Sequence, residues 1–187
     1  MHNKPTIYYF ISNFNPYEIK KLNKNISLIY RNYDGKPNIK LINDIKKVCI
    51  FQKRKFYISN NLKIAKKLKL DGVYIPSFNN LLNCKNLSVV KKFKIIGSAH
   101  NKIEVLNKKK QGCSEVFISP IFKTKKYTSY LNICRFNLIS NSTDLKAIAL
   151  GGVNCSNYYK LRSAMCSGFA AISWIKKTGL IKKLGRL

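Results

Sequence analysis

The sequence predicts a single α/β domain over residues 1–187, folded as a compact (β/α)8 barrel of the TIM type. Short apolar runs that resemble strands alternate with helix-like stretches, and eight such runs recur roughly every 20–25 residues. No stretch rich in Pro, Gly and Ser interrupts this alternation, so no linker divides the chain. Strands joined by crossover helices are parallel, and eight parallel strands close naturally into a barrel.

The eight expected strands are, in chain order, Ile7–Ser12, Ser27–Arg31, Phe56–Ser59, Gly72–Ile75, Lys94–Ser98, Glu115–Ser119, Ala147–Gly151 and Gly168–Ser173. The alternative arrangement is an open, doubly wound sheet. It is less favoured because no expected strand is followed by G-x-G-x-x-G or by a Walker loop. The first crossover, at 13–26, is short, so a trimmed or irregular start of the barrel is a further alternative.

Three crossovers show the periodicity of a helix. One apolar face runs through the helix expected at 39–51, and another through the helix expected at 62–70. The helix expected at 102–111 follows Asn101, and Glu104 lies three residues further on, which is the pattern of a capping box.

The net charge of +29 results from 36 Lys and Arg against 7 Asp and Glu. Lysines occur on almost every expected helix, at 20–24, 45–47, 63–69, 91–94, 108–110 and 176–183. A dedicated nucleic-acid binder concentrates its charge on one face and favours arginine. We therefore expect solvated helix faces and no specific nucleic-acid partner. Attraction of anionic ligands or polyanions by the summed field is the alternative.

No apolar run approaches the ~20 residues of a membrane span. The first ten residues also lack the pattern of a secretory signal, which favours a cytoplasmic protein with no membrane partner. The six cysteines form no C-x-x-C pair and there are only two histidines, so no zinc site of known spacing is present. We expect reduced cysteines in the core.

The residues that follow the expected strands are polar, cationic or small. They are Arg31, Asn60, Ser77, Asn79, Ser98, His100, the segment 120–126, Gly151, Gly152 and Ser173. In a β/α barrel these positions meet at one end and form the active site. The set contains no carboxylate, which suits an anion better than general acid–base chemistry. Gly-Gly after a strand leaves bare backbone N–H groups, as phosphate sites use.

Seven short motifs carry a family resemblance: LIYRNYD (28–34), ISN (58–60), LDGVY (70–74), SAH (98–100), SPIFKT (119–124), GGV (151–153) and ISWI (172–175). In content, order and spacing they resemble the thiamine phosphate synthase / thiazole tautomerase family, from about residue 28 to residue 175. The resemblance implies a transferase that joins a pyrimidine pyrophosphate to a thiazole phosphate and releases pyrophosphate. The tautomerase branch is disfavoured because it needs a histidine where this chain has Pro120.

The resemblance also implies roles for individual residues. Gly151, Gly152, Ile172 and Ser173, helped by Thr124, would hold the thiazole phosphate. The catalytic residues would be Arg31, Ser98 and Lys126, while Asn60, Asn79 and Lys125 would lie on the pyrophosphate side. His100 is expected to be a hydrogen-bonding residue at a strand end rather than a base, and Trp174 is expected to pack.

One departure concerns magnesium, because the two magnesium-binding aspartates of the family fall on Asn60 and Asn79. An amide keeps an acceptor oxygen but loses the charge that holds a hard dication. We therefore expect no metal site formed by protein ligands, with Lys123, Lys125 and Lys126 partly replacing the metal. The alternative function is a diverged, non-catalytic barrel that binds a heterocycle phosphate. The sequence leaves the oligomeric state open.

Overall fold

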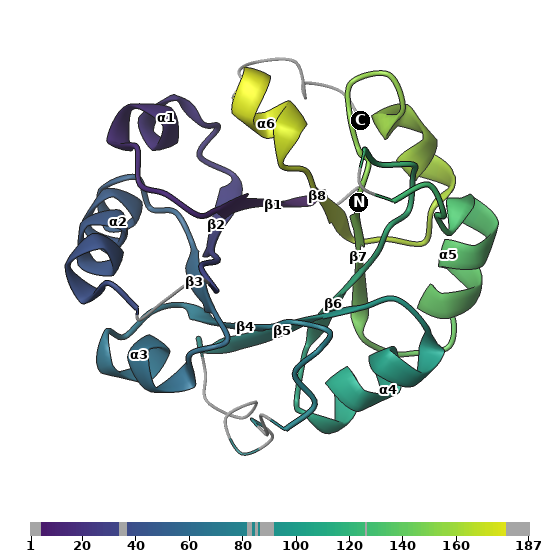
Figure 1. The fold of residues 1–187 in the computed structure, drawn as a ribbon, viewed down its shortest axis with the longest axis horizontal. Coiled ribbons are helices and arrows are strands. Elements are labelled where there is room, and N and C mark those ends of the chain that lie inside the picture. The colour runs from purple at the N-terminus through teal and green to yellow at the C-terminus, as the bar shows by residue number, and fades with distance from the viewer. Residues whose placement is uncertain are drawn as a thin grey trace.

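The computed structural model describes residues 5–33, 37–81, 84, 86, 92–125 and 127–178, and within them it forms a closed barrel of parallel strands (Figure 1). Each strand pairs with the next in sequence, and the last pairs with the first. The strands are β1 (Thr6–Ile11), β2 (Ile26–Tyr30), β3 (Phe56–Ser59), β4 (Gly72–Ile75), β5 (Lys94–Ala99), β6 (Glu115–Ile118), β7 (Lys146–Leu150) and β8 (Gly168–Ala170). The predicted (β/α)8 barrel is confirmed, and the open sheet is excluded.

Helices surround this barrel (Figure 1). They are α1 (Pro16–Lys21), α2 (Ile39–Phe51), α3 (Leu62–Lys67), α4 (Lys102–Lys110), α5 (Asn132–Ser140), the 3-10 helix η2 (Tyr158–Ser163) and α6 (Ser173–Thr178). The last strand was predicted to reach Ser173, but it ends at Ala170 because Ser173 is already the first residue of α6. Among the described residues, no helix is long and apolar enough to cross a membrane.

Asparagine side chains begin the first four helices. Asn15, Asn38, Asn61 and Asn101 each accept a hydrogen bond from a backbone N–H in the first turn of the helix that follows. The predicted capping box at α4 is present in a modified form. Asn101 accepts from the Glu104 N–H at 2.9 Å, while the Glu104 carboxylate accepts from the His100 N–H at 2.8 Å. Caps of this kind fix where each crossover begins.

Two apolar cores follow from the alternation of side chains along the strands. The inner core fills the barrel and consists of Tyr8, Phe10, Ile29, Tyr57, Tyr74, Ile96, Phe117, Ile148 and Ala170. The outer core lies between strands and helices and includes Ile42, Ile45 and Val105. Because bulky side chains fill its interior, the barrel has no pore, and a ligand must bind at one of its ends.

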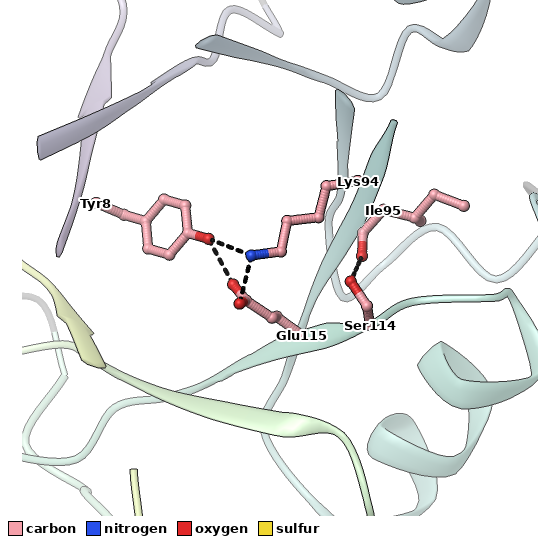
Figure 2. A network of polar contacts seen from close by, with 5 residues as sticks. All are labelled: Tyr8, Lys94, Ile95, Ser114 and Glu115. Atoms are coloured by element: carbon pink, nitrogen blue, oxygen red, sulfur yellow. Dashed lines mark hydrogen bonds and ion pairs between the residues drawn. The ribbon is translucent and has the colours of Figure 1, made fainter. Parts of the chain in front are cut away.

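A buried polar cluster closes the barrel at the N-terminal ends of the strands. Tyr8, Lys94 and Glu115 point toward one another from β1, β5 and β6 (Figure 2). Glu115 accepts from the Tyr8 hydroxyl and from Lys94 Nζ, both at 2.5 Å, although it is only 2% exposed. Burial raises the pKa of Tyr8. This end is therefore occupied by protein side chains that satisfy one another.

The six cysteines are all free, as predicted, but only Cys49, Cys84 and Cys113 are buried in the core. Burial raises the pKa of the Cys49 and Cys113 thiols to about 12. The prediction of core positions is wrong for Cys134 and Cys155, which are exposed. Cys134 lies on α5 and Cys155 in the loop after β7, and an apolar neighbour in sequence does not place either one inward.

Candidate functional site

The predicted site residues that the structure describes all lie at the C-terminal ends of the strands, which we call the mouth of the barrel. Arg31 follows β2, Asn60 follows β3, Asn79 follows β4, Ser98 lies near the end of β5, Thr124 and Lys125 follow β6, Gly151 and Gly152 follow β7, and Ile172 and Ser173 follow β8. Since all eight strands are parallel, these positions share one end of the barrel. Lys126 lies outside the described residues.

Gly151 and Gly152 bring the loop after β7 against the loop after β6. Both have positive φ, 91° and 73°. A Cβ atom at Gly152 would lie 2.5 Å from the Lys123 carbonyl oxygen and 2.6 Å from that of Phe122. The Phe122 N–H donates to the Gly151 carbonyl at 3.1 Å. Only glycine allows this backbone-to-backbone packing together with this φ.

The carbonyl oxygen of Gly152 accepts hydrogen bonds within the protein, whereas its N–H does not donate to any described residue. Its carbonyl oxygen accepts from the side-chain amides of Asn154 at 3.1 Å and Asn157 at 2.9 Å. Its N–H, like that of Gly151, donates to no acceptor among the described residues. These two N–H groups are therefore available to an anion at the mouth.

The Thr124 side chain forms hydrogen bonds within the turn that joins Thr124 to Tyr127. Its hydroxyl accepts from the Tyr127 N–H at 2.8 Å and donates to the Tyr127 carbonyl at 3.3 Å. The Thr124 N–H also donates to that carbonyl, at 3.1 Å. This side chain shapes the loop after β6, and Lys125 is exposed on the same turn.

Ile172 and Ser173 are both exposed where β8 passes into α6. The Ile172 carbonyl accepts from the Lys176 N–H at 2.9 Å, which closes the first turn. Trp174 packs against Phe169, with ring centroids 6.0 Å apart, and against Tyr158 at 5.3 Å. Trp174 is thus a packing residue, as predicted, and it anchors α6 on the barrel.

Asn60 and Asn79 are 19 residues apart in sequence and contact each other directly. The Asn79 side-chain NH2 donates to Asn60 Oδ1 at 2.5 Å, and Asn79 Oδ1 accepts from the Leu81 N–H at 3.0 Å. Asn60 has φ of 59°, a left-handed conformation that asparagine tolerates better than most residues. Sequence reasoning placed both residues on one side of the site, and the structure brings them together.

This amide pair does not fit magnesium as a protein-made site. Each Oδ1 already accepts a hydrogen bond, and neither residue carries the charge from which oxygen-ligand sites take much of their affinity. Within the described ranges, no three His, Cys, Asp or Glu side chains gather in a way that could hold a metal ion.

Arg31 is held against the inner core at the mouth. Its guanidinium carbon lies 5.0 Å from the centre of the Phe10 ring, and its backbone N–H donates to the Ile11 carbonyl at 2.8 Å. A cation over an aromatic face is stabilised by the ring quadrupole. Ser98 is buried near the end of β5. Burial raises the pKa of Tyr74, and Ser98 opposes that shift.

His100 hydrogen-bonds at the strand ends, as predicted. Its Nδ1 lies 2.7 Å from the Ser119 carbonyl oxygen, which requires a donor, so a neutral ring has Nε2 as its acceptor. That Nε2 lies 3.3 Å from the Ser77 hydroxyl. The ring therefore links the ends of β4, β5 and β6.

An aromatic pair at the mouth was not predicted. The rings of Tyr33 and Phe78 meet edge to face with centroids 5.4 Å apart, and the Tyr33 hydroxyl lies 3.1 Å from Ser59 Oγ. Burial raises the pKa of Tyr33. An open pocket of about 440 Å³ is lined by Phe78, Asn79, Asn80 and Leu81 among the described residues. The available signal was Tyr33 itself, an aromatic residue two places after Arg31 in the LIYRNYD motif.

Comparisons with known proteins point to one family. A family model described as thiamine monophosphate synthase matches residues 22–175. A thiamine-phosphate synthase of Prochlorococcus marinus is 29% identical over 160 residues, covering 82% of this chain and 46% of that protein. The thiamine-phosphate synthase of Pelagibacter ubique is 33% identical over 128 residues, covering 63% of this chain and 58% of that protein. This chain thus spans about half the length of these two relatives.

A solved structure supports the fold independently of sequence. The thiamine phosphate pyrophosphorylase from Pyrococcus furiosus superposes with a TM-score of 0.74, covering 93% of this chain and 91% of that chain. At 14% sequence identity, this likeness concerns the barrel alone.

Proposed function

Because the chain belongs to the thiamine monophosphate synthase family, we propose that it joins a pyrimidine pyrophosphate to a thiazole phosphate and releases pyrophosphate. The observation that carries this proposal is the pair of glycines after β7. Their N–H groups have no acceptor among the described residues, and Gly152 is packed too closely to admit a side chain. Such a backbone surface suits a phosphate group.

The chemistry suits a site without a general base. When the bond between the pyrimidine methylene carbon and the pyrophosphate oxygen breaks, pyrophosphate leaves with the electron pair. The thiazole nitrogen then donates its lone pair to the carbocation, and the product is a thiazolium. No proton is transferred in either step, so the reaction needs positioning and stabilisation of charge rather than an acid or a base.

The residues divide into two halves in this proposal. Gly151, Gly152 and Ser173 hold the thiazole phosphate. Arg31, together with Lys125 and Lys126, stabilises the negative charge that develops on the leaving pyrophosphate. Ser98 orients the pyrophosphate side of the substrate from the end of β5.

Magnesium is the ion that the family resemblance implies. The Asn60–Asn79 pair would offer it neutral oxygens only, so we propose that the cations of Arg31 and the loop after β6 contribute more in this chain. Lysines act as point charges rather than as a fixed fork, so the compensation is partial and turnover is slow.

The test is product formation. Purified protein is incubated with both precursors, once with magnesium and once with a chelator, and thiamine phosphate and pyrophosphate are measured. We expect slow formation of both products in equal amounts, with a weaker magnesium dependence than that of a family member carrying two aspartates. Absence of product under every condition would contradict the proposed reaction.

The second candidate is a binding protein that has kept the phosphate site and lost catalysis. The observation that favours it is the uncharged Asn60–Asn79 pair, since a fold and its phosphate site can outlast a reaction. Calorimetric titration with thiazole phosphate separates the two candidates. Tight binding without product supports the second candidate, and product supports the first.

A further inference from the structure

One lysine of α4 is buried although its neighbours are exposed. Lys108 has no exposed surface, whereas Lys109 and Lys110 beside it lie in solvent. This overturns the expectation that 108–110 is a solvated face. Lysine is almost never fully buried unless it is paired. No carboxylate contacts its ammonium group among the described residues, and its hydrogen bonds run to neutral oxygens instead.

Lys108 Nζ donates to the carbonyl oxygen of Asn79 and to Gln111 Oε1, both at 2.8 Å. The Gln111 side-chain NH2 donates to the same Asn79 carbonyl at 3.0 Å. Two donors from α4 and its C-terminal end therefore bind one backbone oxygen of the loop after β4. The Gln111 carbonyl also accepts from the Cys84 N–H at 3.0 Å, so this loop is tied to α4 at a second point.

The barrel makes room for this side chain at Gly97 on β5. A Cβ atom there would lie 2.8 Å from Lys108 Cδ and 2.9 Å from Cys113 Sγ. Burial lowers the pKa of Lys108. An apolar side chain of similar length would fill the same space without the cost of desolvating an amine. What the amine adds is its hold on the Asn79 carbonyl.

Asn79 connects this anchor to the mouth. Its backbone oxygen is held by Lys108 and Gln111, and its side chain donates to Asn60 at 2.5 Å. A chain of direct contacts thus runs from α4 through Asn79 to the end of β3. It does not involve the loops after β7 and β8.

We propose that Lys108 is a positioning residue that fixes the Asn60–Asn79 pair and thereby sets the pyrophosphate half of the site. This inference rests on the proposed function for the identity of the anion. The hydrogen bonds from Lys108 and Gln111 to the loop after β4 do not depend on that function.

The experiment compares Lys108→Met with Lys110→Met, which removes the same charge from an exposed position on the same helix. Three quantities are measured: amide hydrogen exchange at residues 77–81 and 152–154, binding of inorganic pyrophosphate, and binding of thiazole phosphate. In Lys108→Met we expect exchange at 77–81 to become about tenfold faster and pyrophosphate to bind about tenfold more weakly, because the Asn79 carbonyl loses its charged hydrogen-bond donor. Exchange at 152–154 and thiazole phosphate binding stay within about twofold. Lys110→Met behaves like the parent.

Unchanged exchange at 77–81 in Lys108→Met overturns the positioning role. Equal losses for pyrophosphate and thiazole phosphate also overturn it, since a general loss of structure would act on both. A parent that binds no pyrophosphate overturns the functional half of the inference. If the parent binds pyrophosphate but forms no thiamine phosphate, the proposed reaction fails while the positioning role is still decided by exchange and binding.

If Lys108→Met does not fold, a second variant still tests the inference. Gln111→Leu removes one of the two donors to Asn79 and one of the two acceptors of Lys108 Nζ, but it leaves the direct hydrogen bond from Lys108 to Asn79 in place. We expect about threefold faster exchange at 77–81 and about threefold weaker pyrophosphate binding, consistent with the smaller worth of a neutral hydrogen bond. If Gln111→Leu matches the parent in both measurements and Lys108→Met does not fold, the inference is overturned.

Discussion

At the N-terminal ends of the strands, charged side chains are paired with one another, whereas at the mouth the site is built from amides, hydroxyls, glycines and cations. Lys55–Asp71, Lys94–Glu115 and Lys109–Asp144 all join residues that lie at or just before the starts of strands or in the last turn of α4. At the mouth, Arg31 pairs with no carboxylate among the described residues and lies over an aromatic ring.

Under the proposed function, this difference separates the residues that stabilise the fold from the residues that bind the ligand. The chain has only seven Asp and Glu residues, and three of them, Asp71, Glu115 and Asp144, form ion pairs with lysines at the closed end. The cations of the mouth then keep their charge available for an anionic ligand, whose approach the overall positive charge also favours. The closed end should therefore respond to mutation in stability, and the mouth in ligand binding.

The largest effect is expected at the closed end. Lys94→Met leaves the Glu115 carboxylate buried, and within the described ranges the Tyr8 hydroxyl is then its only hydrogen-bond partner. Loss of one partner of a fully buried pair costs about 3–5 kcal/mol. The Lys94 side chain is 34% exposed, so we expect about 3 kcal/mol in urea unfolding. Thiazole phosphate binding should be unchanged in the folded variant.

Lys55→Met is the matched control for this prediction. It breaks the Lys55–Asp71 pair, whose side chains are 61% and 29% exposed, and it should cost less than about 1 kcal/mol. The double variant Lys94→Met, Glu115→Leu should recover much of the loss, because it removes the unpaired charge. If Lys94→Met costs no more than Lys55→Met, the buried pair does not stabilise the closed end.

The second prediction moves to the mouth. Gly152→Ala places a Cβ 2.5 Å from the Lys123 carbonyl oxygen at a φ of 73°, so the loop must shift and its N–H groups move with it. Loss of hydrogen bonds to a charged phosphate is worth about 1.5–3 kcal/mol, so thiazole phosphate should bind roughly 10- to 100-fold more weakly in calorimetric titration.

Gly112→Ala provides the control at the opposite end. Gly112 also has positive φ, 88°, but it follows α4 at the N-terminal side of the barrel. Alanine there costs a comparable backbone strain of about 1 kcal/mol without touching the mouth. Equal weakening of thiazole phosphate binding in both variants would show that the phosphate site lies elsewhere.

The same comparison explains what the sequence could predict. Apolar runs and crossovers predicted seven strands closely, and the Gly-Gly motif predicted a backbone surface at the mouth, because both are encoded by neighbouring residues. Lys94 and Glu115 carried no sign of their pairing with Tyr8, which lies 107 residues before Glu115. The run of lysines at 108–110 predicted a solvated face. The burial of Lys108 could not be predicted from that run, because it depends on Gly97 and Asn79 in other parts of the fold. Contacts of this kind follow from the closed barrel rather than from local pattern.

The smallest effect is expected at the Asn60–Asn79 pair. The double variant Asn60→Asp, Asn79→Asp places two carboxylates where a hydrogen bond of 2.5 Å now joins two amides. Without metal the like charges repel, and we expect a loss of about 1 kcal/mol in stability. Added magnesium should restore this loss, and magnesium should bind about tenfold more tightly than to the parent, since ligand charge supplies much of the affinity of oxygen sites.

The matched control is a pair of single variants, Asn79→Asp and Asn80→Asp, in which the same change is made one residue apart. Asn80 is exposed and forms no hydrogen bond with Asn60 among the described residues, so the Asn80→Asp variant should leave magnesium affinity at the parent level.

Product formation with magnesium and with chelator then measures how the two added carboxylates affect the reaction. The double variant should become more magnesium-dependent than the parent, and its rate should rise if charge at these positions limits turnover. Strict magnesium dependence and high turnover in the parent would mean that the substrate pyrophosphate recruits the ion without these two positions. In that case the difference between the two ends of the barrel would lie in ligand geometry rather than in protein charge.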